Sequence, residues 1–169
     1  MKKLAILILI SLVLFSCQKE EEVALQNELT FSLYKGSDFN YTGNISVREL
    51  PNGDLELTLE LEGEKDASEY YFPAHLHFGA YDQMDSPIAY MLNPVDIRSL
   101  KSVTVLGNLS DGRKLSFEDF KSFDGHIKVH LADSGPEYLV ILSVGNIGKN
   151  DNSPEAFKVE NMTMCSPYY

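Results

Sequence analysis

Histidine is the residue type whose placement points to chemistry in this chain of 169 residues. The four histidines fall in two short stretches, as His75 with His77 and as His126 with His130. Neutral imidazole is a common metal ligand, and sites built from imidazole alone suit copper, zinc or nickel. The spacing does not choose among these metals. A second interpretation is that the rings only form hydrogen bonds to backbone or water.

Both stretches have the alternation of a β-strand, which decides where the imidazoles point. Residues two apart lie on the same face of a strand, so His75 and His77 share one face. In the second stretch, aliphatic side chains alternate with the two histidines and a lysine. His126, Lys128 and His130 are therefore expected together on the outer face.

Three imidazoles can converge on one ion if these two strands are neighbours. His126 and His130 are about 13 Å apart along a straight strand, so both do not easily join one site. His130 is the better candidate and His126 the doubtful one. The spacing thus predicts a metal site of His75, His77 and His130, provided that the strands pair.

The elements that must position these residues are short strands. Polar and apolar residues alternate from Leu29, and residues 44–62 predict an antiparallel hairpin around Pro51-Asn52-Gly53-Asp54. Further strands are expected near 70–81, 86–92, 102–107, 126–132, 138–145 and 156–164. We predict an all-β fold, an antiparallel Greek-key sandwich or barrel, in a single domain over residues 28–169.

One stretch departs from the strand pattern and predicts a short helix near 116–123. Ser116 and Asp119 have the spacing of a capping box, and Asp124-Gly125 follows the stretch. Its three phenylalanines, at intervals of three residues, are expected to face inward: Phe117, Phe120 and Phe123.

The N-terminus has the pattern of a secretory signal. Lys2 and Lys3 precede an apolar run that is too short to span a bilayer. The ending Leu14-Phe15-Ser16-Cys17 resembles the bacterial lipobox, in which the cysteine is acylated and becomes the mature N-terminus. The resemblance implies a signal peptide over residues 1–16 and a palmitate-type lipid on Cys17.

The residues after the cysteine indicate where the protein is exported. Gln18-Lys19-Glu20-Glu21-Glu22 resembles the acidic surface-export tag of Bacteroidetes lipoproteins, which implies an outer-membrane lipoprotein at the cell surface. The alternative is a solvated tether over residues 17–27. Removing residues 1–16 with their two lysines leaves 153 residues and changes the net charge from −11 to −13. Cys165 then has no partner for a disulfide.

The acidic balance excludes classes of partner. A net charge of −11 is opposite to what phosphate binding requires, so nucleic acid is not an expected partner. The same charge argues against electrostatic docking onto anionic lipid. Membrane contact is therefore expected through the lipid anchor alone, and the sequence identifies no protein partner.

The histidine stretches also resemble known families. Ala74-His75-Leu76-His77-Phe78-Gly79 resembles the His-x-His strand of copper/zinc superoxide dismutases, and Val129-His130-Leu131-Ala132-Asp133 resembles the later strand that supplies another copper ligand. Both are even more similar to CHRD domains, the chordin-type modules, over roughly residues 54–148. The resemblance implies a Greek-key β-fold in which His75, His77 and His130 bind copper.

The departures from the dismutase pattern limit what it implies. No histidine lies between His77 and His126, so the zinc site and the bridging histidine are missing, and zinc is not expected. No arginine follows Arg113 to guide an anionic substrate, and Lys149 is the nearest cationic substitute. We predict a non-enzymatic, copper-binding module. The alternatives are a metal-free protein-interaction module and a copper-only superoxide dismutase.

Overall fold

The computed structural model describes residues 27–163. The predicted signal peptide, the predicted lipidation site Cys17, nearly all of the predicted tether, and Cys165 lie outside the described residues. Among the described residues there is no helix of the length and apolar character that crossing a membrane requires.

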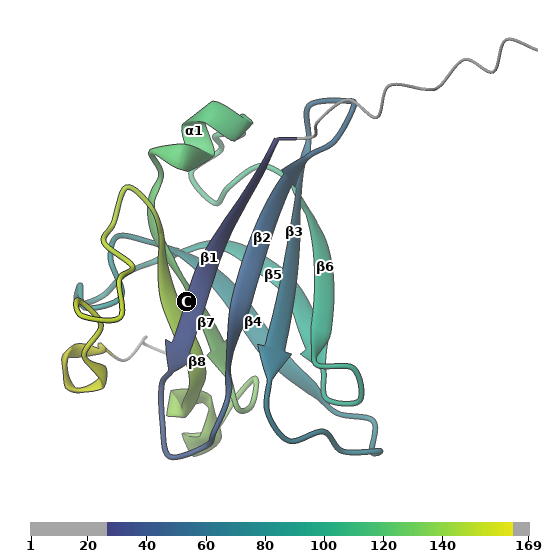
Figure 1. The fold of residues 1–169 in the computed structure, drawn as a ribbon, viewed down its shortest axis with the longest axis vertical. Helices are drawn as coiled ribbons and strands as arrows, with labels where there is room; N and C mark the ends of the chain where they lie inside the picture. Colours follow the sequence, from purple (N-terminus) through teal and green to yellow (C-terminus); the bar gives the residue numbers. More distant parts are fainter. Residues whose placement is uncertain (1–26, 164–169) are drawn as a thin grey trace, which may run out of the picture.

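Eight antiparallel strands form a closed barrel in the order β1-β2-β3-β6-β5-β4-β7-β8 (Figure 1). The strands are β1 (Glu28–Lys35), β2 (Thr42–Glu49), β3 (Leu55–Glu62), β4 (Tyr71–Phe78), β5 (Ile88–Asp96), β6 (Lys101–Leu106), β7 (Asp124–His130) and β8 (Ile141–Gly148). Consecutive strands β4, β5 and β6 are neighbours, and β7 returns to lie beside β4, which is a Greek-key connection. The predicted all-β antiparallel fold is confirmed, as a barrel.

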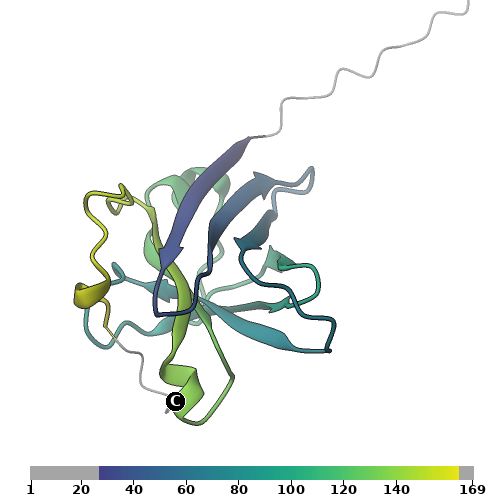
Figure 2. The same ribbon diagram turned by 60° about the horizontal axis from the view of Figure 1, so that its bottom comes forward.

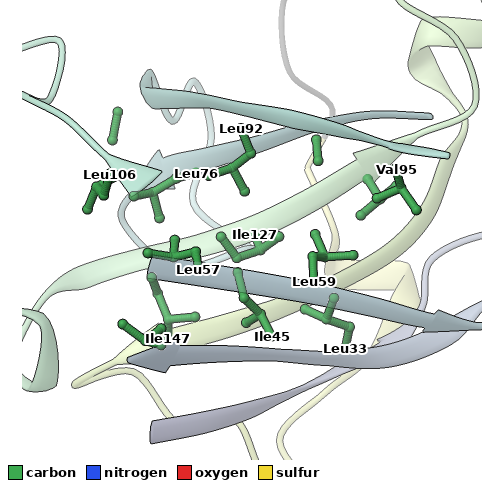
Figure 3. Close-up of a cluster of buried hydrophobic side chains, with 14 of the residues drawn as sticks. Leu33, Ile45, Leu57, Leu59, Leu76, Leu92, Val95, Leu106, Ile127 and Ile147 are labelled. Carbon is green, nitrogen blue, oxygen red and sulfur yellow. The ribbon is translucent and has the colours of Figure 1, made fainter. Parts of the chain in front are cut away.

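The barrel interior is filled by the aliphatic residues of the strand alternation. Side chains from β1, β2, β3, β4, β5, β6, β7 and β8 converge on one interior (Figure 3). In β3, Leu55, Leu57 and Leu59 are each 1% exposed, whereas Glu60 and Glu62 lie on the exposed side. The predicted hairpin of β2 and β3 is confirmed, and Gly53 takes the positive φ of 80° in its turn.

Closure of the barrel depends on a close approach between its first and last strands. β1 pairs with β8 through Tyr34 and Lys35, opposite Val144 and Ser143. A Cβ atom at Gly145 would lie 2.2 Å from the Ser32 carbonyl oxygen, so only glycine fits at this position.

The predicted helix is confirmed as α1 (Phe117–Lys121), at one end of the barrel (Figure 1). Ser116 is its N-cap, and the Ser116 and Asp119 side chains form the reciprocal capping box. All three phenylalanines of the stretch are buried, as expected. Two short 3₁₀ helices were not predicted, η1 (Pro136–Leu139) and η2 (Val159–Asn161).

The predicted strand near 156–164 is wrong: residues 156–163 form turns and η2 (yellow in Figure 2). Because β1 pairs with β8, the closed barrel offers no free edge for a further strand. Phe157 and Met162 instead pack on the outside of the barrel, against a small cluster that contains Tyr81 and Val144.

Candidate metal centre

Strands β4 and β7 are neighbours. This pairing is the condition under which the sequence predicts a metal site of three histidines. In their antiparallel register His75 lies opposite Lys128 and His77 lies opposite His126. Ala74 and Leu76 of β4 and Ile127 and Val129 of β7 belong to the barrel core. The histidines and Lys128 therefore project from the opposite, outer face of the same two strands, as expected.

The structure brings three of the four imidazoles together. One ring nitrogen from each of His75, His77 and His130 lies within 4.8 Å of the other two. The ring centroids are 4.8 Å apart for His75 and His130 and 5.8 Å for His75 and His77. Two ligands of one ion, each at about 2.0–2.1 Å, are at most about 4 Å apart. Displacements of less than about 1 Å thus suffice for one ion to contact all three nitrogens.

Backbone carbonyls fix the orientation of two of these rings. His77 Nδ1 lies 3.1 Å from the Ser86 carbonyl oxygen, and His130 Nδ1 lies 2.7 Å from the Tyr138 carbonyl oxygen. A carbonyl only accepts, so each Nδ1 carries the proton and donates, and the lone pair of each ring is on Nε2. Metal-binding histidines usually donate the N–H of the ring nitrogen that does not bind the metal to a carbonyl or a carboxylate, as Nδ1 does in both of these rings.

Two nitrogens of the cluster are buried and have no hydrogen-bond partner among residues 27–163. These are Nδ1 of His75 and Nε2 of His130. A buried polar atom that lacks a partner costs free energy, about 1–3 kcal/mol. A metal ion held by the three imidazoles would satisfy these atoms, so the residues present fit such an ion.

Burial also keeps the rings neutral. Desolvation lowers the pKa of His75 to about 4 and that of His130 to about 3, and it lowers the pKa of His77 further still. Imidazole binds a metal in its neutral form. At neutral pH these rings are therefore ready to bind an ion without first losing a proton.

His126 takes a different place from the other three. Its ring stacks on His77, with centroids 4.8 Å apart and planes at 9°, and its Nδ1 donates to the Gly79 carbonyl oxygen at 2.7 Å. It does not belong to the group of three nitrogens that lie within 4.8 Å. Its Nε2 is buried and has no hydrogen-bond partner in the described part of the chain.

The outer face of β4 and β7 is covered, which the sequence did not indicate. Lys128 is fully buried, and its Nζ donates to the Thr163 carbonyl oxygen at 2.7 Å. The Tyr138 ring stacks on His130, with centroids 4.3 Å apart. The carbonyls of Ser86 and Tyr138 that contact the rings come from the β4–β5 and β7–β8 connections. Because any residue type supplies a backbone carbonyl, the sequence did not indicate these two contacts.

Searches of family models, of curated proteins and of solved structures found no match to this chain.

Proposed function

We propose that this chain is a surface-anchored lipoprotein whose non-enzymatic β-barrel domain binds copper through His75, His77 and His130. The observation that carries the proposal is the group of three buried imidazoles whose nitrogens lie within 4.8 Å of one another. An imidazole set of this kind suits copper, and copper bound there would supply a thiophilic, redox-active cation.

Two features of the cluster support a metal rather than a purely structural role. His75 Nδ1 and His130 Nε2 have no hydrogen-bond partner, although a purely structural cluster would be expected to satisfy them. The carbonyl contacts of His77 and His130 leave the opposite nitrogen of each ring with its lone pair.

The proposal is for binding rather than for dismutation. The cation that could replace a guiding arginine, Lys149, has its Nζ 2.9 Å from Asp124 Oδ2, and both side chains are about half exposed. This pairing offsets the charge that would attract an anionic radical. Superoxide consumption by the copper-loaded protein, no faster than that by free copper, is the expected result.

Metal binding is tested by thermal unfolding of the full chain with Cu(II) or Zn(II) added. A ligand at about 100 times its Kd stabilises the folded state by about 2.7 kcal/mol, so copper should raise Tm by several degrees. His130→Gln should abolish this increase, because it removes one of three ligands. His126→Gln is the matched control, and it should keep most of the increase.

Two outcomes would decide against the copper site. An unchanged Tm for the wild type with either metal would favour the metal-free interaction module. An equal loss in His126→Gln and His130→Gln would show that the three named histidines are not the specific ligands.

Attachment of the chain to a membrane is a separate part of the proposal and rests on the lipobox-like sequence that ends at Cys17. Several acyl chains would hold the protein stably, since each buried methylene contributes about 0.8 kcal/mol. Cys17→Ser should move the protein from the membrane to the soluble fraction, and the mature wild type should carry the mass of the lipid. A wild-type N-terminus without added lipid would contradict this part.

A further inference from the structure

A methionine lies beside the histidine cluster, on the side of β4 away from β7. In the β4–β5 pairing, Met91 lies directly opposite His75. Directly opposite residues of an antiparallel pair project on the same face, with Cβ atoms about 4.5–5.5 Å apart. Met91 therefore belongs to the same outer face as His75, and it is 62% exposed whereas His75 is 2% exposed.

Met91 and one histidine of the cluster share a pocket of about 330 Å³. Met91 and His75 both line it, together with aromatic and aliphatic residues that include Tyr70 and Tyr71. Among the described residues that line it, Asp133 is the one charged side chain, so the pocket favours a cation over an anion. Of the three clustered histidines, only His75 lines this pocket.

The chemistry of the two side chains selects one kind of cation. A thioether is a soft ligand, which suits Cu(I), whereas Zn(II) in proteins is bound by thiolate, imidazole and carboxylate. Methionine also has a flexible, unbranched side chain, so its sulfur can move between positions. An exposed thioether next to an orphaned buried imidazole nitrogen is therefore a pair suited to receiving Cu(I).

We propose that Met91 and His75 form an entry site at which Cu(I) is captured before it reaches the three-histidine cluster. This inference rests on the proposed copper site and deepens it, because it assigns the oxidation state that is delivered and the side from which it enters. Met91 Sδ and His75 bind the incoming ion, and Met91 Sδ stays bound to Cu(I) when His77 or His130 becomes a further ligand. Each step adds a ligand to the ion and involves no change of oxidation state.

The test compares Met91→Leu with Met84→Leu in the full chain. Both replacements remove a thioether with little change of volume, and Met84 is the matched control because it is 76% exposed and is not among the pocket-lining residues. Cys17 and Cys165 are replaced by serine in every version so that no thiol competes for copper. Cu(I) affinity is measured anaerobically by competition with a chromophoric chelator, and Zn(II) affinity is measured in parallel.

Met91→Leu should weaken Cu(I) binding on the order of tenfold and leave Zn(II) binding unchanged. Met84→Leu should alter neither. X-ray absorption at the copper edge of the protein with one equivalent of Cu(I) gives a second measurement, in which a sulfur neighbour should be present in the parent and absent in Met91→Leu.

The inference is overturned if Met91→Leu binds Cu(I) as tightly as the parent, or if it weakens Cu(I) and Zn(II) equally. In either case the proposed copper site stands as long as His130→Gln still removes binding. A parent protein that binds no copper at all would overturn the proposed function and this inference together.

Discussion

The outer surface of the barrel has two faces that differ in what covers them. On β3 and β6, Glu60 and Lys101 are about half exposed and form an ion pair in contact with solvent. On β4 and β7, the histidines and Lys128 also project outward, yet each is at most 2% exposed. The same alternation of residue types thus produces a solvated face in one place and a desolvated polar face in the other.

The difference shows that a polar face becomes chemically distinctive when other segments cover it. The Thr163 carbonyl oxygen accepts a hydrogen bond from the Lys128 ammonium, and the Thr163 hydroxyl donates to the Gln83 carbonyl oxygen at 2.7 Å. Tyr138 covers His130 from the β7–β8 connection. Removal of water from around the imidazoles lowers their pKa values and leaves ring nitrogens without partners, which are the two properties that suit a metal site.

Acidification should destabilise the covered face most. The pKa values of His75, His126 and His130 are lowered by burial to between about 3 and about 4, from a usual 6.5. Below about pH 6.5 the unfolded chain therefore binds more protons than the folded protein, and stability falls as the pH falls. Each such histidine contributes about 1.4 kcal/mol per pH unit. Metal-free protein should lose several kcal/mol between pH 7 and pH 5, measured by urea unfolding with a chelator present.

His126→Gln provides the check on this pH dependence, because it removes one buried imidazole outside the group of three. The slope of the free energy of unfolding against pH should decrease by about 1.4 kcal/mol per pH unit between about pH 6.5 and pH 5. An unchanged slope would show that His126 does not stay neutral in the folded protein, and the contrast between the two faces would be weaker than the burial indicates.

The elements and the shared face of the histidines were predictable because they follow from local rules. Strand alternation placed His75 with His77 and His126 with His130, and the Ser116–Asp119 spacing predicted α1. The pairing of β4 with β7 did not follow from the same rules, since pairing between strands distant in sequence depends on the whole barrel.

The remaining features depend on contacts between distant segments and were not accessible from local pattern. Residues 156–163 have an alternation that predicts a strand, but barrel closure by β1 and β8 removes the edge on which it would pair. The carbonyls of Ser86 and Tyr138 carry no side-chain signature, because any residue supplies a carbonyl. The position of Met91 opposite His75 follows from the register of β4 and β5, which shifts at two places along the pairing.

The two lysines of the contrasting faces give the second, smaller test. Lys128→Ala removes a fully buried stem and the donor to the Thr163 carbonyl, so it should lower the free energy of unfolding by about 2–4 kcal/mol. Lys101→Ala should cost less than about 1 kcal/mol, because its pair with Glu60, at 2.6 Å, is solvated and screened by salt. Urea unfolding at pH 7 measures both.

A third variant separates packing from hydrogen bonding on the covered face. Lys128→Met keeps most of the stem volume and removes the donor, so its cost should lie between those of Lys101→Ala and Lys128→Ala, at about 1–2 kcal/mol. If Lys128→Met is instead more stable than the wild type, the desolvation of the ammonium outweighs its contact with Thr163, as happens at some buried ion pairs. Equal costs for Lys128→Ala and Lys101→Ala would mean that the cover over β4 and β7 opens readily, and the two faces would then be alike in solution.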